Sequence, residues 1–428
     1  MLNLSPVLLL IFKLLLQCTN DSNRSLTLHH IKQVMEYRRF GKTNKNISAI
    51  TLGGMRFKQA WDNPRNEIPT ATQDHCNQIV DLALKNGINH FETAYGYIKS
   101  ETVFGRTLNE ELNIDRSSYY LMTKGNPNTA DETRQLIEEQ LKTLKTDYLD
   151  FYGWHGINTA DLMHSACQTG GAVEELLRMK EEGIIKHVGF STHGSLDTIK
   201  DTISTDLFEF VNLHYYYFYQ RNEAAIALAQ EKDLGVFIIS PNDKGGQLYK
   251  APDKIREAIP HASPIQWNAR FCLSHPGVHT LSFGMTEAAH FDEMKGIFPS
   301  HVPLNTADNE SKQRLDDLIN DDTYAAYEAY SLKDESSDLD IPLLLHWRKL
   351  WKCYDLLDFA RYRYKELKTP NHWVPGAYAT AEAINKIDFS QVPNDIPLRE
   401  MLTEVHQAFY QKPEAPIVID PQKITLAK

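Results

Sequence analysis

Short apolar runs alternate with amphipathic stretches along most of this chain. From Met35 onward, runs of β-branched and apolar residues predict buried strands, and stretches whose apolar residues recur every three or four positions predict helices. The predicted strands are Ile47–Gly54, His90–Ala94, Tyr119–Lys124, Tyr148–His155, His187–Thr192, Glu209–Tyr215, Gly235–Ser240 and His279–Gly284. The helical stretches between them include Asp74–Asn86, Asp131–Lys145, Ala172–Glu182 and Asn222–Lys232.

This alternation predicts an α/β protein with a parallel sheet. Eight strand–helix units over roughly 250 residues match the size of a (β/α)8 TIM barrel. The rival fold is a doubly wound sheet, which usually carries GxGxxG after its first strand when it binds a dinucleotide. That pattern does not occur in the chain, so we favour the barrel. Met35–Lys45 could form a small hairpin that closes the barrel bottom.

The pattern changes after about Pro303. The next segment, Asn305–Asp340, is rich in Asp, Glu, Ser and Asn and contains a helical stretch near Gln313–Tyr330. Two later segments also predict helices, Ile341–Leu367 and Pro397–Phe409. In the first of these, aromatic and apolar residues recur at spacings of three and four and predict a buried face: Trp347, Trp351, Tyr354 and Leu357. We therefore expect a barrel over residues 35–320 and a C-terminal α-helical extension over residues 321–428.

The first 34 residues are expected to be an N-terminal extension outside the folded core. Val7–Leu16 is apolar, but Lys13 interrupts it and it is too short to span a bilayer. It also lacks the basic start and the small-residue cleavage site of a signal peptide.

Composition narrows the class of protein. A chain of 428 residues with 42% hydrophobic residues can form one large domain plus an extension. The net charge of −11 and the absence of a long basic run argue against nucleic acid and anionic membranes as partners. Five scattered cysteines without CxxC argue against a disulfide framework and a cysteine-rich metal site. We expect a cytoplasmic protein.

Four reactive side chains lie where predicted strands give way to loops: Glu92, Tyr97, Lys124 and His155. In a β/α barrel the carboxyl ends of the strands form the catalytic face. Tyr97 could give a proton, and the ammonium of Lys124 would lower its pKa. Glu92 would pair with that ammonium, and a neutral His155 could orient a carbonyl oxygen for the transfer.

Two other enzyme classes have weaker support. A barrel metallohydrolase could use His155, His193 and His214, but neither HxH nor HExxH occurs. A serine hydrolase is disfavoured because GxSxG is absent. No metal site is therefore expected.

Several segments together resemble the aldo-keto reductase family. They occur in the family's order and cover nearly all of residues 35–296: Met35–Met55, Gly87–Tyr97, Met122–Gly125, Asp147–His155, Ile184–His193 and Thr280–Glu293. The resemblance implies a (β/α)8 fold and NAD(P)-dependent reduction of an aldehyde or ketone to an alcohol. It also implies a catalytic set of Tyr97, Lys124, His155 and Glu92, with Glu92 standing where the family usually has Asp.

The same resemblance implies the cofactor-binding residues. They are Gly53, Gly54, Met55, Ser191, Thr192, Asn212, Ser240, Lys244, Gly284 and Glu293. Gly284–Glu293 lacks the basic residue that usually meets a 2′-phosphate, so the cofactor is NADP(H) or NAD(H), with weak discrimination expected.

The extension resembles a ferredoxin-like extension found in some relatives. Ile341–Leu367 and Val392–Phe409 match its flanks, but the stretch between them contains no cysteine. Because clusters are held by several thiolates, we expect no iron–sulfur cluster. The expected function is reduction of a small-molecule carbonyl. The alternative is a cofactor-binding redox-sensing or regulatory barrel with little turnover, against which the complete catalytic set argues.

Overall fold

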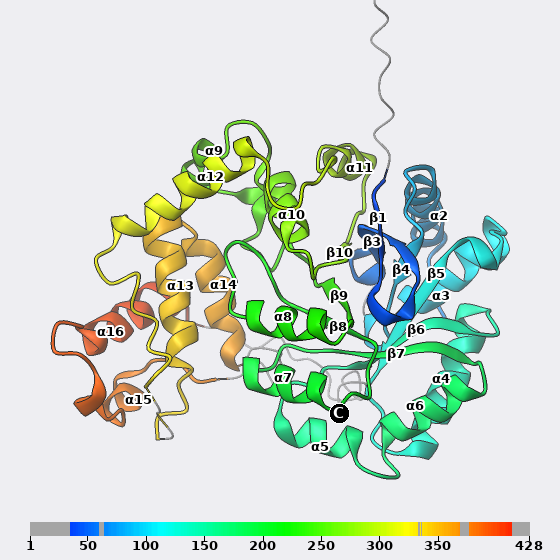
Figure 1. Cartoon of the computed structure of the whole chain (residues 1–428), viewed down its shortest axis with the longest axis horizontal. Coiled ribbons are helices and arrows are strands. Elements are labelled where there is room, and N and C mark those ends of the chain that lie inside the picture. Colours follow the sequence, from blue (N-terminus) through cyan, green and yellow to red (C-terminus); the bar gives the residue numbers. More distant parts are fainter. Residues whose placement is uncertain (1–34, 60–63, 333, 335, 369–375, 413–428) are drawn as a thin grey trace, which may run out of the picture. The chain divides into compact units, whose positions relative to one another are not determined.

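The barrel is the central feature of the computed structural model, which describes residues 35–59, 64–332, 334, 336–368 and 376–412. Eight parallel strands close on themselves, with helices around them (Figure 1). In order around the barrel they are β3 (Ile50–Gly53), β4 (His90–Glu92), β5 (Tyr120–Gly125), β6 (Leu149–His155), β7 (Ile185–Ser191), β8 (Phe210–Leu213), β9 (Gly235–Ile238) and β10 (Thr280–Phe283). The predicted (β/α)8 barrel is confirmed. The predicted N-terminal extension, residues 1–34, lies outside the described residues.

Helices connect successive strands, as the periodicity predicted. They are α2 (Thr70–Lys85), α3 (Ser100–Arg106), α4 (Ala130–Leu144), α5 (Ala160–Cys167), α6 (Ala172–Glu181), α7 (Leu196–Ser204), α8 (Glu223–Glu231), α9 (Asp253–Ala258), α10 (Pro264–Ser274) and α11 (Ala288–Lys295). Local sequence sets their ends. In α4, the hydroxyl of Thr129 accepts the N–H of Glu132 at 3.2 Å, and Lys145 ends the helix in the left-handed conformation.

A two-stranded hairpin precedes the barrel, formed by β1 (Tyr37–Arg39) and β2 (Asn46–Ser48). The predicted strand Ile47–Gly54 is thus two strands, which separate at Ala49. Between β1 and β2, Phe40 is fully buried against the barrel residues Phe151 and Phe210. The side chain of Phe40 therefore fills the end of the barrel opposite the strand carboxyl ends, as expected of a closing hairpin.

Helices continue after the barrel: α12 (Thr306–Asp317), α13 (Ile341–Tyr354), α14 (Leu357–Lys365), α15 (Ala381–Asn385) and α16 (Leu398–Phe409). The helix predicted near Gln313–Tyr330 was misplaced, because Asn305 caps α12 by accepting the N–H of Asp308 at 2.8 Å. The segment predicted as one helix, Ile341–Leu367, is broken at Asp355, which has φ +57°.

The extension packs on loops of the barrel. The ring of Tyr354 on α13 lies 5.0 Å from that of Phe218, and its hydroxyl lies 3.5 Å from the hydroxyl of Tyr217. Trp347 and Tyr354 of the predicted apolar face are buried, whereas Trp351 and Leu357 are only partly buried and Leu357 begins α14. These contacts attach α13 to the segment that follows β8.

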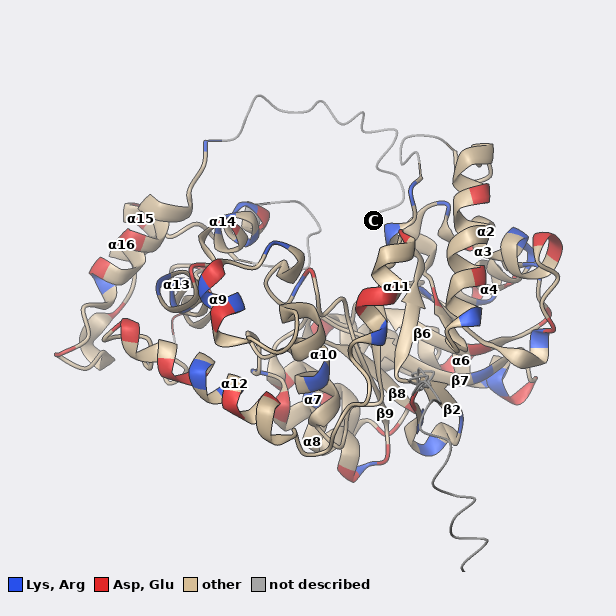
Figure 2. Ribbon diagram, turned by 90° about the horizontal axis from the view of Figure 1, so that it is seen from above, with Lys and Arg blue, Asp and Glu red and all other residues tan. Residues whose placement is uncertain are grey.

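Charged residues of both signs occupy the outer helices. Along α12, two basic side chains lie between acidic ones (Figure 2). None of the helices in the described part of the chain has the length and hydrophobicity needed to cross a membrane.

Candidate active site

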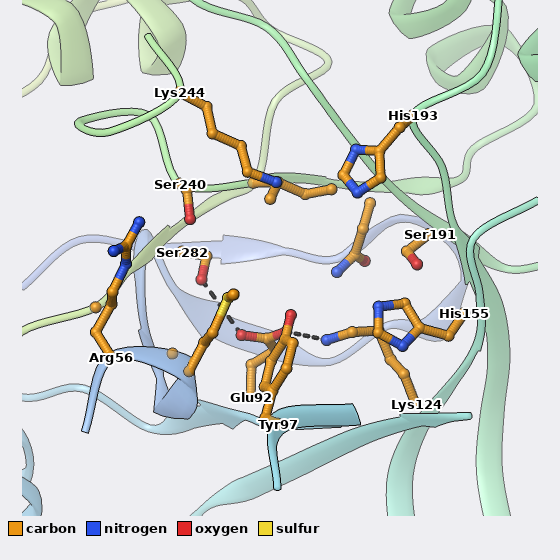
Figure 3. A pocket seen from close by; sticks show the side chains of 15 residues that line it. Arg56, Glu92, Tyr97, Lys124, His155, Ser191, His193, Ser240, Lys244 and Ser282 are labelled. Carbon is orange, nitrogen blue, oxygen red and sulfur yellow. Dashed lines mark hydrogen bonds and ion pairs between the residues drawn. The ribbon is translucent and has the colours of Figure 1, made fainter. Parts of the chain in front are cut away.

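The four predicted catalytic residues meet at the carboxyl ends of adjacent strands. Glu92 ends β4, Lys124 lies near the end of β5, and His155 ends β6. Tyr97 ends a short 3-10 turn, Tyr95–Tyr97, that follows β4. All four line one pocket (Figure 3), so parallel strands bring together residues that are up to 63 positions apart in the chain (92 to 155).

Glu92 is the shared partner within this cluster. One of its carboxylate oxygens accepts from the ammonium of Lys124 and from the phenol of Tyr97, the latter at 3.3 Å. Its other oxygen accepts from the hydroxyl of Ser282 at 3.4 Å. The ammonium also donates to the carbonyl of Thr93 at 3.0 Å. Both charges of the ion pair are buried, so their geometry is tightly fixed.

Tyr97 lies beside the ion pair and close to His155 (Figure 3). The ammonium of Lys124 is 5.0 Å from the centroid of the phenol ring. The rings of Tyr97 and His155 are 6.0 Å apart and nearly perpendicular, at 88°. The two rings are therefore in edge-to-face contact, and a group that lies beside both can reach both polar side chains.

Burial dominates the protonation of the cluster. It raises the pKa of Tyr97 above the usual value, opposite to the direction expected from a nearby ammonium, because Lys124 is already paired with Glu92. Burial, followed by the charge of Lys244, lowers the pKa of Lys124. Burial also lowers the pKa of His155 to about 3, helped by the charges of Lys124 and Lys244. At neutral pH Tyr97 is thus a protonated phenol and His155 a neutral imidazole.

Most of the predicted cofactor residues line the same pocket: Gly53, Met55, Ser191, Asn212, Ser240, Lys244 and Gly284. Three others do not, namely Gly54, Thr192 and Glu293. A side chain at Gly54 would collide with Ser100 and Phe104. The hydroxyl of Thr192 donates to Ile157 at 2.6 Å, and Glu293 accepts from Ser263.

Four lining residues were not among the predicted site residues: Arg56, His193, Ile239 and Ser282. Arg56 follows the Gly-Gly turn after β3 and pairs with Asp243 at 2.7 Å. All four lie within three residues of the carboxyl end of a strand, and this position is the signal in the sequence that could have indicated them.

The sequence also suggests an aromatic pocket lined by Trp61, Tyr95, Trp154 and Tyr217, but the three of these residues that the structure describes do not line it. Trp154 is buried and donates to the carbonyl of Pro127 at 3.1 Å, and Tyr217 donates to Asp316 at 2.8 Å. Neither lines the pocket, and Trp61 lies outside the described residues. In the described parts of the chain, no group of three or more His, Cys, Asp or Glu residues could hold a metal ion.

Residues 49–317 match the Aldo/keto reductase family, which is more than half of the chain. The chain belongs to this family. It is 25% identical over 239 residues to an uncharacterized oxidoreductase of Bacillus subtilis, YqkF, across 53% of this chain and 71% of the relative. It is also 25% identical over 245 residues to a probable aldo-keto reductase of Glycine max, across 54% and 66%.

This member of the aldo/keto reductase family is also similar to D-arabinose 1-dehydrogenase of Saccharomyces cerevisiae. The two chains are 27% identical over 157 residues. That match covers 34% of this chain and 43% of the yeast protein. Among solved structures, the holo form of an aldo-keto reductase from Bacillus halodurans superposes with a TM-score of 0.54 at 22% identity, covering 65% of this chain and 96% of the other. That likeness concerns the fold. Family and relatives together support an oxidoreductase role.

Proposed function

We propose that this family member reduces the carbonyl group of a small aldehyde or ketone to an alcohol, with NAD(P)H as reductant. The observation that supports this most directly is the convergence of Tyr97, Lys124, Glu92 and His155 in one pocket. Reduction of a carbonyl needs a hydride at carbon and a proton at oxygen. The four side chains suit the second requirement.

Tyr97 is the proposed general acid. Its raised pKa keeps the phenol protonated at neutral pH, so the proton is present when the substrate arrives. As negative charge develops on the substrate oxygen, the phenol gives its proton to that oxygen. The ammonium of Lys124 then stabilises the phenolate from 5.0 Å, measured to the ring centroid.

His155 is the proposed orienting group. A neutral imidazole carries one N–H, which can donate to the carbonyl oxygen without competing as an acid. Glu92 accepts from Tyr97 at 3.3 Å, so the phenol must turn its proton from Glu92 to the substrate before it reacts.

The pocket also has features that suit the cofactor. Asn212 is 2% exposed, and its carbonyl oxygen has no hydrogen-bond partner among the described residues, so it could accept from a carboxamide N–H. A side chain at Gly53 would collide with Ser282, and one at Gly284 would collide with Arg56. Only a residue without a side chain therefore fits at these two positions. The cation of Lys244 would meet the diphosphate. When bound, NAD(P)H supplies the hydride.

A titration followed by a substrate screen tests the proposal. NADPH and NADH are each added to the pure protein while its fluorescence is followed, and small aldehydes and ketones are then screened for oxidation of the reduced cofactor. We expect saturable binding of at least one cofactor and turnover with a subset of carbonyls. Failure to bind either cofactor would contradict the proposal, and so would binding without turnover across the screen.

A further inference from the structure

The turn that carries Tyr97 has a strained backbone. Tyr97 ends the 3-10 turn after β4 and α3 begins at Ser100, so Ile98 and Lys99 connect the proposed acid to this helix. Ile98 has φ +53° and ψ −97°, a combination that a residue with a Cβ avoids. Lys99 belongs to the start of the helix, because its carbonyl oxygen accepts from the N–H of Val103 at 2.9 Å. A contact from outside the turn must therefore hold Ile98 in this conformation.

The side chain of Gln59 supplies that contact. Gln59 lies in the segment between β3 and α2, and its Oε1 accepts from the N–H of Lys99 at 2.9 Å. Its Nε2 donates to the carbonyl oxygen of Tyr97 at 3.3 Å. A backbone N–H can only donate and a carbonyl oxygen can only accept, so the two partners fix the orientation of the amide. One side chain thus holds the two peptide groups that flank Ile98.

Arg65 holds the other end of the same turn. Its guanidinium donates to the carbonyl oxygen of Tyr95 at 2.8 Å and lies 3.8 Å from the centroid of the Tyr95 ring. It also pairs with the buried carboxylate of Glu101 on α3 at 2.5 Å. Gln59 differs from Arg65, because within the part of the chain that the structure describes its side chain hydrogen-bonds only to the turn. A change at Gln59 therefore acts on the turn alone.

The backbone at Ile98 sets the place of the Tyr97 phenol. The phenol donates to Glu92 at 3.3 Å, and the ammonium of Lys124 lies 5.0 Å from its ring centroid. If Ile98 relaxed to an ordinary conformation, the carbonyl of Tyr97 would turn and the phenol would move relative to both groups. A displacement of about 1 Å can lower the rate of a reaction about 10²-fold. Gln59 does not line the pocket, so this effect concerns the rate and not the binding of ligands.

We propose that Gln59 is a positioning residue for the carbonyl reduction. It keeps the phenol of Tyr97 in its reactive place by holding the strained peptide groups on both sides of Ile98. This assignment rests on the proposed reductase function. It extends the site to a residue that touches neither the substrate nor the cofactor pocket.

The first test is Gln59→Met in the full-length protein, with NADPH and the best carbonyl of the screen. Methionine keeps the length of the side chain and removes both hydrogen bonds. We expect kcat to fall about tenfold, because the bonds that oppose the strain are lost. KM and the affinity for NADPH should stay within about twofold of the wild type, because Gln59 lies outside the pocket. The matched control is Gln220→Met, which removes a hydrogen bond of 2.8 Å to the carbonyl of Tyr217 and should leave kcat unchanged.

A second substitution separates positioning from a general loss of packing. Glycine adopts the backbone of Ile98 without strain, so in an Ile98→Gly protein the turn depends less on Gln59. Adding Gln59→Met to Ile98→Gly should therefore lower kcat only about twofold, compared with about tenfold in the wild-type background. A loss of packing around Gln59 would instead lower kcat by the same factor in both backgrounds.

Hydrogen exchange at the amide of Lys99 gives a readout that does not depend on activity. In the wild type this N–H is bonded to Gln59, so it should exchange slowly. In Gln59→Met it should exchange at least about tenfold faster, and in the control Gln220→Met it should not change.

Each contrary result is distinct. An unchanged kcat in Gln59→Met overturns the proposal, and so does an equal loss of kcat in the two backgrounds. A Gln59→Met protein that loses affinity for NADPH while kcat stays constant also overturns it, since Gln59 would then act on binding. Unchanged exchange at Lys99 would show that Gln59 does not hold the turn. If the wild type reduces no carbonyl at all, the proposed function itself fails, whatever the exchange at Lys99 shows.

Discussion

At the scale of single residues, Glu92 holds the site together. It accepts from Lys124, Tyr97 and Ser282, and removing its carboxylate would leave the buried ammonium of Lys124 without its counter-charge. Glu92→Ala should therefore lower the free energy of unfolding by about 3–5 kcal/mol. Urea denaturation measures this. Glu92→Asp, which keeps the charge, should lose much less, and equal stability of the Ala and Asp variants would contradict this account.

Ile98 is the residue that follows the proposed acid, and its backbone is strained. It has φ +53° and ψ −97°, a region that residues with a Cβ avoid. We expect Ile98→Gly to be more stable than Ile98→Ala by about 1 kcal/mol, because both lose the same side-chain burial and only glycine relieves the strain. Thermal denaturation of the two variants tests this prediction. If Ile98→Ala is the more stable variant, the interpretation of strain at Ile98 is wrong.

Some site residues were predictable from chemistry and others were not. Glu92, Tyr97, Lys124 and His155 combine a reactive side chain with a position at a strand end, and the pocket contains all four. His193 also follows a strand, but its residue type indicated only a possible metal ligand. Its contact with His214, which follows the neighbouring strand β8 and in turn contacts Tyr216, results from the pairing of β7 with β8 rather than from local sequence.

At the scale of elements, the sequence located the buried parallel strands well but misplaced the helix boundaries after the barrel. Strands covered on both faces read as continuous apolar runs, and their ends were predicted to within a few residues. In contrast, α12 has a polar sequence in which the cap residue Asn305 determines the start. The break at Asp355 needs a left-handed residue, which helical periodicity alone does not reveal.

The attachment of α13 to the barrel gives a prediction at this scale. Tyr354 is 4% exposed and packs on Tyr217 and Phe218, so Tyr354→Ala should cost about 3–5 kcal/mol of unfolding free energy. The control is Tyr362→Ala on α14, a tyrosine that is 40% exposed, which should cost less than about 1 kcal/mol. Chemical denaturation compares them. Similar losses in the two variants would mean that the contact with the barrel contributes little.

At the scale of the whole molecule, buried neutral histidines link stability to pH. Burial lowers the pKa of His90 and of His155 to about 3, whereas an unfolded imidazole has a pKa near 6.5. Between those values the unfolded chain binds protons that the folded chain does not. Stability is therefore lost as the pH falls below about 6.5, by roughly 2 kcal/mol per histidine at pH 5.

Denaturation at pH 7 and at pH 5 measures this loss. His90→Asn removes one of the groups and can keep a hydrogen bond to Thr51, which lies 2.8 Å from the imidazole. The difference in stability between the two pH values should shrink by about 2 kcal/mol in that variant. An unchanged difference would show that His90 titrates normally in the folded protein.

The central claim is that Tyr97 supplies the proton in a carbonyl reduction. The most direct test is the turnover of Tyr97→Phe beside that of the wild type, at saturating reduced cofactor and with the best carbonyl of the screen. The variant should bind the cofactor with nearly unchanged affinity and turn over about 10² times more slowly, the usual contribution of a general acid. Equal turnover of the two proteins would contradict the assignment of Tyr97 as the acid.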